Sequence, residues 1–160
     1  MLLAGSLFVF YGCTKTGSQG PQGPAGQNGN ADVIGTQPFT SAAWSFVSAN
    51  NDFEATYTDA DITAAVADSG LVIMYIQYTD GSWRNLPDIL NGTEFSFGFY
   101  QGGFVIHYFD VDGSAPTMPS SETFRTVIVP SSVRKANPGT KWNNYNETVS
   151  VLNGQPAAIY

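Results

Sequence analysis

The hydrophobic positions between residues 31 and 160 recur mainly with a period of two, which is the period of a β-strand. Phe95, Phe97 and Phe99 alternate with small or polar residues, so their three rings share one face of a strand. A Gln-Gly-Gly turn signal and a second apolar run follow. The pattern therefore predicts a β-hairpin over residues 94–110.

Further strands are expected where apolar runs end at turn or proline signals. Residues 71–78 are almost continuously apolar, which predicts a central strand with both faces covered. Residues 124–129 are rich in β-branched side chains and stop at a proline, which favours another strand. Shorter or weaker strands are expected in three segments: 43–47, 53–57 and 82–86.

Two segments carry helix signals. Asp59 or Asp61 can cap a short helix over 62–67, closed by Gly70. Near the C-terminus, apolar residues at helical spacing predict one or two helical turns within 142–152. Both helices are short, so strands dominate the chain.

The number and spacing of the strands decide the fold class. About seven strands, with a turn signal roughly every ten residues, favour a mainly β fold. We expect an antiparallel β-sandwich over residues 31–160, with one or two short helices. A small β-barrel is the alternative.

The N-terminal segment has a different pattern. Residues 1–12 form a short apolar run that ends in Gly12, and the only cysteine, Cys13, follows. This resembles the end of a bacterial lipoprotein signal peptide, in which the bond before Cys13 is cleaved and the cysteine carries the lipid. No Lys or Arg precedes the run, so we expect the true start to lie upstream. A buried strand with a core cysteine is the alternative.

Glycine then recurs at every third position in a stretch without charge or large apolar side chains. A strict Gly-X-Y period with proline at X is typical of collagen, because only glycine fits the axis of the triple helix. As an extended spacer, such a stretch reaches roughly 45 Å. We expect residues 13–30 to be an unstructured spacer, with a homotrimer-forming stub as the alternative. The repeating glycines are Gly17, Gly20, Gly23, Gly26 and Gly29.

These features together resemble a known group. Cys13, a Gly-Pro-Gln-Gly-Pro-Ala-Gly stretch and a compact domain are similar to the collagen-like lipoproteins of Gram-negative bacteria. The runs Asn-Ala-Asp-Val-Ile-Gly at 30–35 and Asn-Tyr-Asn-Glu-Thr-Val at 144–149 also resemble members of that group. The resemblance implies a lipid-anchored place in the cell envelope, and it supplies no catalytic residues.

Composition narrows the classes of partner. The chain has 160 residues, a length that fits one domain of ordinary size. Its net charge is −7. Nucleic-acid binding needs a basic surface, so nucleic acid is excluded as a partner. The single cysteine excludes an intramolecular disulfide, and the single histidine excludes a His-rich metal site.

His107 is the only imidazole, so any acid–base proposal must use it. Ser96 could lie on the neighbouring strand as a hydroxyl nucleophile. However, the sequence contains no Gly-x-Ser-x-Gly motif, and spacing fixes no acidic partner. We therefore interpret His107 as a surface or cross-strand histidine and expect no enzymatic activity.

The sequence offers two candidate binding sites, one for calcium and one for sugar. Asp110, Asp112 and Ser114 offer oxygen atoms at alternate positions just after a strand, as calcium prefers. Asp-x-Asp-Gly is also common turn chemistry, which is the alternative. Trp44, Trp83 and Trp142, with the eight tyrosines, could supply a flat platform that stacks on sugar rings, and Trp83 is favoured because it follows a turn.

We therefore expect a non-enzymatic cell-envelope lipoprotein, with a β-sandwich head on a short collagen-like stalk and a structural or adhesive role. Its partners would be the membrane, through the lipid on Cys13, and an envelope protein or glycan. The alternative function is an accessory module that binds carbohydrate or calcium. The inner and the outer membrane are both open as the location.

Overall fold

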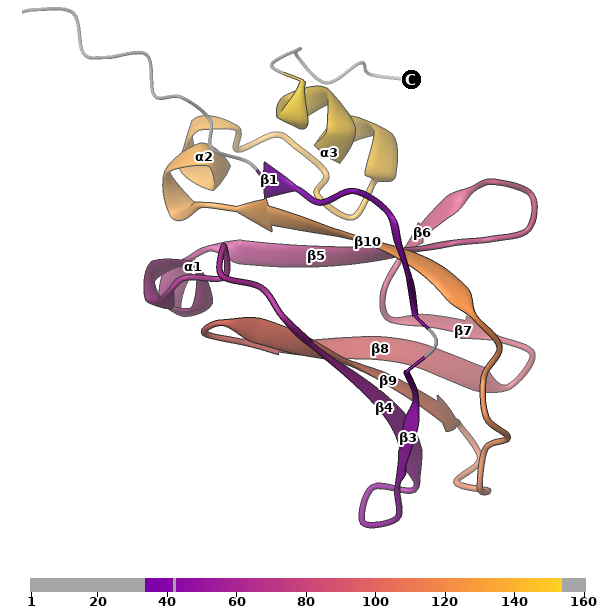
Figure 1. Cartoon of the computed structure of the whole chain (residues 1–160). Coiled ribbons are helices and arrows are strands. Elements are labelled where there is room, and N and C mark those ends of the chain that lie inside the picture. Colours follow the sequence, from indigo (N-terminus) through magenta and orange to yellow (C-terminus); the bar gives the residue numbers. More distant parts are fainter. Residues whose placement is uncertain (1–33, 42, 154–160) are drawn as a thin grey trace, which may run out of the picture.

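The computed structural model describes residues 34–41 and 43–153 (Figure 1). The predicted signal segment at 1–12 and the predicted spacer at 13–30 lie outside the described residues. So do the lipidation site and the repeating glycines, namely Cys13, Gly17, Gly20, Gly23, Gly26 and Gly29.

The described residues form two antiparallel sheets of five strands each. Sheet A contains β1 (Ile34–Gly35), β2 (Phe39–Ser41), β5 (Leu71–Gln77), β6 (Trp83–Asn85) and β10 (Glu122–Val129). Sheet B contains β3 (Ser45–Val47), β4 (Asp52–Thr58), β7 (Asp88–Leu90), β8 (Thr93–Tyr100) and β9 (Gly103–Asp110). The sheets pack face to face without closing (Figure 1). The β-sandwich is therefore confirmed, and the barrel alternative is wrong.

The predicted hairpin is present as β8 and β9. Phe95 pairs with Tyr108 and Phe97 pairs with Ile106, so the alternating rings face the same side as the apolar residues of β9. Gly102 turns the chain with a φ of 90°, a left-handed conformation that favours glycine. The pattern of period two therefore specified both the strands and their register.

Strand β5 lies between β10 and β6 in sheet A. Its side chains alternate between two apolar clusters, and all five central residues are buried. Val72, Met74 and Ile76 face sheet B, whereas Ile73 and Tyr75 face the opposite side. The prediction of a central strand with both faces covered is confirmed.

The main core fills the space between the sheets and is rich in aromatic rings. Phe95 and Phe124 meet edge to face, with ring centroids 5.7 Å apart. Burial of each large apolar side chain contributes about 1.5–3 kcal/mol. The buried members of this core are Trp44, Ala55, Ile62, Val66, Val72, Met74, Ile76, Leu86, Phe104, Ile106, Phe124 and Ile128.

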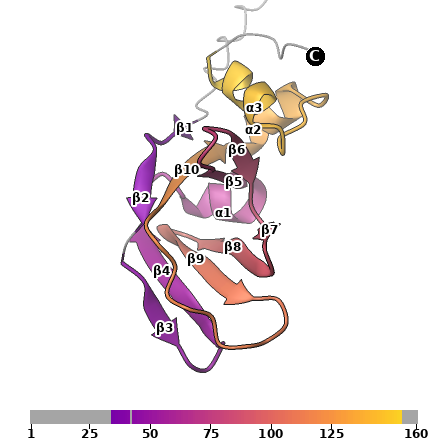
Figure 2. The ribbon, with the colours of Figure 1, turned by 90° about the vertical axis from the view of Figure 1, so that its right-hand side faces the viewer.

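A second core covers the outer face of sheet A. Helices α2 (Ser131–Ala136) and α3 (Tyr145–Leu152) lie over β5, β6 and β10 (Figure 2). Inside this layer, the Tyr75 hydroxyl lies 2.9 Å from the Trp142 carbonyl oxygen and 2.9 Å from Thr148 Oγ1. The molecule therefore has three layers: helices, sheet A and sheet B.

The helices differ in detail from the sequence prediction. Helix α1 (Ala64–Ser69) is capped by Thr63, whose Oγ1 accepts a hydrogen bond from the Val66 amide, so the capping role expected for Asp59 or Asp61 is wrong. Asp59 instead accepts a bond from the Asp61 amide in a turn. Helix α2 was not predicted. Among the described residues, the helices are too short to span a bilayer.

Candidate functional site

A groove lies where the turn between β5 and β6 meets the start of α3. Trp83 pairs with Gln77 at the edge of sheet A, on the face that the helices cover. Its ring stacks on Tyr145, the first residue of α3, with centroids 5.3 Å apart and an interplanar angle of 17°. Two aromatic rings from distant parts of the chain therefore form one wall of the groove.

Four asparagines line the rest of the groove, together with Gly81, Ser82 and Arg84. Its volume is about 530 Å³. Asparagine supplies both a donor and an acceptor to any ligand that enters. The lining residues are Gly81, Ser82, Trp83, Arg84, Asn85, Asn143, Asn144, Tyr145 and Asn146.

Local structure decides which of these amides are available. Asn144 caps α3, since its Oδ1 accepts a hydrogen bond from the Glu147 amide. Asn85 donates its amide to the Leu86 carbonyl oxygen. The side chains of Asn143 and Asn146 are exposed and make no hydrogen bond to the other described residues. Within residues 34–41 and 43–153, these two amides therefore have no competing partner for a ligand.

The groove carries little charge. Arg84 is the one charged residue in its described lining, and the guanidinium lies over the Tyr78 ring at 4.2 Å from the centroid. Aromatic faces combined with amides suit a neutral ligand with many hydroxyl groups. The chemistry of the lining therefore favours a sugar over an ionic ligand.

The three tryptophans do not form one platform. Trp44 is buried in the main core, and Trp142 packs into the second core. A platform that combines Trp83 with Trp44 is therefore wrong, because the core between the sheets holds Trp44. The ring that accompanies Trp83 is Tyr145, one of the eight tyrosines that the sequence offered for the platform.

The segment 110–114 is folded as a tight turn. Asp112 Oδ1 accepts a hydrogen bond from the Ser114 amide, and Ser114 Oγ donates to Asp110 Oδ2. Hydrogen bonding with Ser114 lowers the pKa of the Asp112 carboxyl below its ordinary value. Asn51 holds the turn by donating to the Gly113 and Ser114 carbonyl oxygens. The predicted calcium site at Asp110, Asp112 and Ser114 stays a prediction.

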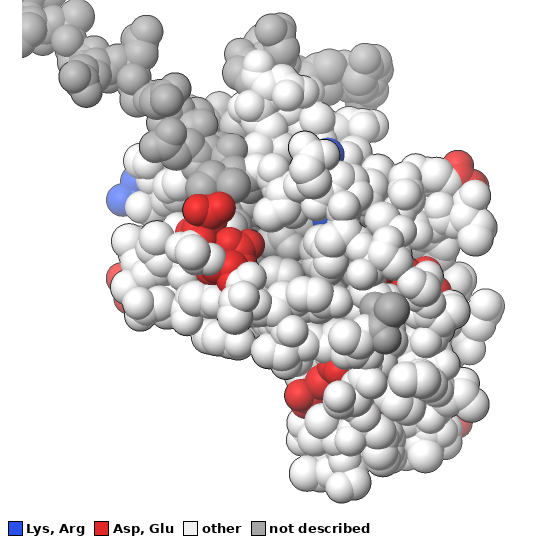
Figure 3. Space-filling model, in the orientation of Figure 1, with Lys and Arg blue, Asp and Glu red and all other residues white. Residues whose placement is uncertain are grey.

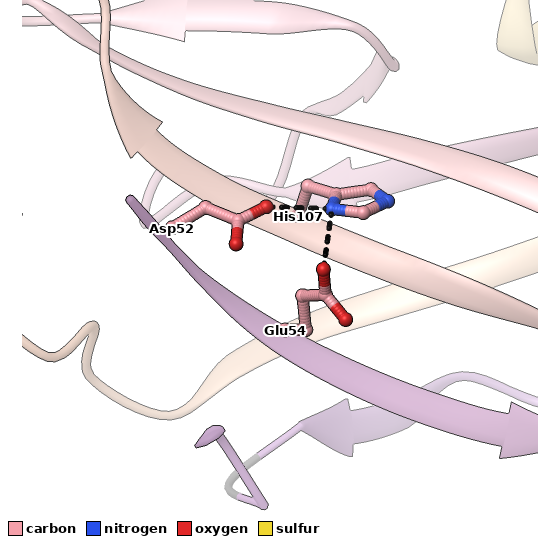
Figure 4. A group of neighbouring side chains, drawn as sticks. All are labelled: Asp52, Glu54 and His107. Carbon is pink, nitrogen blue, oxygen red and sulfur yellow. Dashed lines mark hydrogen bonds and ion pairs between the residues drawn. The ribbon is translucent and has the colours of Figure 1, made fainter. Parts of the chain in front are cut away.

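A second polar group lies on the outer face of sheet B, around His107 (Figure 4). The Nδ1 atom of His107 lies 2.8 Å from Asp52 Oδ2 and 3.7 Å from Glu54 Oε1. Asp52 is 4% exposed, whereas the side chains of His107 and Glu54 are 26% and 23% exposed. Within residues 34–41 and 43–153, Asp52, Glu54 and His107 form the one group of three potential metal ligands whose donor atoms all lie within 4.8 Å of one another.

The register of the sheet explains the arrangement. His107 on β9 pairs with Glu54 on β4 and with Ser96 on β8, so the three residues form one row across the strands. Ser96 therefore lies on the neighbouring strand as considered, but it makes no hydrogen bond to His107 in the described structure. Asp52 and Glu54 were missed as partners. The available signal was their spacing of two, with Glu54 in the predicted strand at 53–57 and Asp52 immediately before it.

Charge does not mark a single binding surface on the face that Figure 3 shows. Acidic side chains lie in small separate groups on that face, and basic side chains are few. The groove beside Trp83 and the polar group around His107 are therefore identified by local geometry and not by surface charge.

Comparison of the chain with protein-family models, with curated proteins and with solved structures found no match. The candidate sites therefore depend on their own geometry and chemistry.

Proposed function

We propose that the chain is a non-enzymatic cell-envelope lipoprotein whose β-sandwich head binds a neutral glycan in the groove beside Trp83. The role is adhesive: a short collagen-like stalk carries the head, and the head holds a carbohydrate of the envelope or its surroundings. The observation that carries this proposal is the stacked Trp83–Tyr145 pair beside the free amides of Asn143 and Asn146.

The composition of the groove supports a carbohydrate ligand. A sugar ring presents an apolar face that packs on an aromatic ring and hydroxyl groups that exchange hydrogen bonds with amides. Each feature of the groove matches one of these needs. Tyr145 also fixes the orientation of Trp83, which lowers the entropy lost when a ligand binds.

The anchor is part of the same proposal and is supported by the sequence. Lipid on Cys13 would hold the chain to a membrane, and residues 14–30 would separate the head from the bilayer by tens of ångströms. A weak glycan site gains from this arrangement, because many heads on one surface bind a polymer multivalently.

A fluorescence titration tests the glycan site. The wild-type protein is titrated with a panel of soluble glucans, mannans, xylans and N-acetylglucosamine oligomers, with tryptophan emission as the readout. We expect saturable binding to a member of the panel. In Trp83→Ala, the affinity should fall at least tenfold, which corresponds to about 1.4 kcal/mol.

The matched control is Phe46→Ala, which removes an aromatic ring that is 46% exposed on β3, in the other sheet. It should bind the panel like the wild type. A thermal melt of each variant shows that the fold is retained. A flat titration of the wild type across the panel would contradict the glycan site, and so would equal losses in Trp83→Ala and Phe46→Ala.

Membrane fractionation tests the anchor. Expressed in a Gram-negative host from its genuine start codon, the wild type should be found with the membranes, and Cys13→Ala should be released to the soluble fraction. The substitution removes the only thiol that can be lipidated. A wild-type protein that is already soluble would contradict the lipoprotein proposal and leave the groove unaffected.

A further inference from the structure

We propose that Asp52, Glu54 and His107 form a binding site for one divalent first-row transition-metal ion, of which Zn²⁺ is the representative probe. The site lies on the outer face of sheet B. It is separate from the Trp83 groove, which belongs to sheet A and α3. The inference therefore does not depend on the proposed glycan function.

The donor atoms are already close to the spacing that such an ion requires. Zinc binds nitrogen and carboxylate oxygen at about 2.0–2.2 Å, so tetrahedral donors lie roughly 3.4 Å apart. Here His107 Nδ1 is 2.8 Å from Asp52 Oδ2 and 3.7 Å from Glu54 Oε1. Shifts of less than an ångström in these contacts would match the tetrahedral separation.

The state of Asp52 is a second, independent indication of a cation-binding site. The residue is 4% exposed, and its Oδ1 atom is buried without a hydrogen-bond partner among the described residues. A buried carboxylate oxygen without a partner is unfavourable by several kcal/mol unless a positive charge lies near it. Figure 4 shows one oxygen of this carboxylate toward the His107 ring and the other oxygen turned away from the ring.

The charges around the site leave room for a cation. In the described part of the chain, the ion pairs of Asp52 and Glu54 are both with His107, and neither carboxylate contacts a lysine or an arginine. Two carboxylates beside one imidazole carry a net negative charge. A bound divalent ion would neutralise it, and bidentate ligation by Asp52 would also give Oδ1 a partner.

The mixture of donors favours a particular class of metal. Calcium and magnesium prefer oxygen ligands alone, whereas imidazole nitrogen suits zinc and its first-row neighbours. The partial exposure of His107 and Glu54 lets water complete the coordination shell. Asn50 donates to Glu54 Oε1 and so orients this ligand from outside the site.

Binding requires the Nδ1 lone pair of His107. The Nδ1 proton that lies between His107 and Asp52 must therefore move to Nε2, or leave to solvent where the ring was charged. No oxidation or covalent step is involved.

The test is a calorimetric titration of the chelator-treated full chain with Zn²⁺, in a Cys13→Ser background that removes the only thiol. We expect one Zn²⁺ per chain, and a melting midpoint that rises with Zn²⁺ in the wild type but not in His107→Gln. His107→Gln and Glu54→Gln should each weaken Zn²⁺ binding at least tenfold. The matched control Asp68→Asn, which removes an exposed carboxylate of α1 outside the site, should bind like the wild type.

The outcomes separate the metal site from a simple ion pair. Absence of Zn²⁺ binding by the wild type up to millimolar concentration would overturn the proposal, and so would binding that survives both His107→Gln and Glu54→Gln. If His107→Gln lowers the melting midpoint while the wild type binds no metal, the contact with Asp52 is a structural ion pair only, and the proposal fails. Trp83→Ala should retain Zn²⁺ binding, so failure of the glycan site leaves this test intact.

Discussion

The two outer faces of the sandwich differ in whether helices cover them. On sheet A, Ile73 and Tyr75 point outward and are buried under α2 and α3. On sheet B, the outward row contains Glu54, His107 and Ser96, and the described helices do not lie over it (Figure 2). A strand that is apolar on both faces therefore indicates a covering layer, whereas strict alternation indicates an open face.

The largest expected effect compares one residue from each outer face. Ile73→Ala should lower the free energy of unfolding by about 2–5 kcal/mol, because it leaves a cavity under the helices. Val105→Ala removes a half-buried side chain from the outer face of sheet B and should cost at most about 1 kcal/mol. Urea denaturation of both variants gives the comparison, and equal losses would contradict a distinction between the two faces.

An intermediate effect separates folding from binding within the groove. Asn144→Ala removes the N-cap of α3 and should cost about 1 kcal/mol of stability. Asn146→Ala removes an exposed amide without a hydrogen bond to the described residues, so stability should be retained while glycan affinity falls. Urea melts and glycan titrations of the same two proteins test this pair. A stability loss confined to Asn146→Ala would show that the cap is assigned to the wrong residue.

The smallest expected effect concerns pH. Burial raises the pKa of the Tyr75 hydroxyl from its ordinary 10 to about 12, although the hydrogen bond with Thr148 opposes the shift. The protonated form is favoured in the folded state, so this stabilisation is complete below pH 10 and is lost as pH rises toward 12. Tyr75→Phe should therefore lose less stability than the wild type over this range.

The melting midpoint at pH 7, 9, 10 and 11 checks that prediction. Tyr78, whose pKa is also raised to about 12 chiefly by burial, should keep part of the alkaline dependence in both proteins. The difference between the two curves is therefore the quantity to compare. Identical slopes above pH 10 would contradict the burial of the Tyr75 hydroxyl under α3.

The sequence predicted those parts of the fold that depend on alternation. The rings of Phe95 and Phe97 specified the hairpin register, and the unbroken apolar run at 71–78 specified the central strand. Helix α2 was missed because it is six residues long, has no side-chain cap and is held mainly by Val133 in the second core. Tertiary packing, rather than a local signal, forms that helix.

The candidate sites were only half predictable for a similar reason. Trp83 was expected to be accessible because it follows a turn, but packing of α3 on β6 brings Tyr145 and Asn146 to it from distant sequence. Likewise, His107 was identified as the only imidazole. Its contact with Asp52 depends on the pairing of β4 with β9, which residue patterns alone do not specify.

The most direct test of the proposed function uses the three tryptophans as reporters of position. In an NMR titration with the glycan that binds best, the indole N–H signal of Trp83 should shift strongly, and that of Trp44, buried between the sheets, should stay in place. Trp83→Phe assigns the signal. A response at Trp44 with Trp83 unchanged, or no response from any indole at saturating glycan, would contradict a sugar site in the groove beside α3.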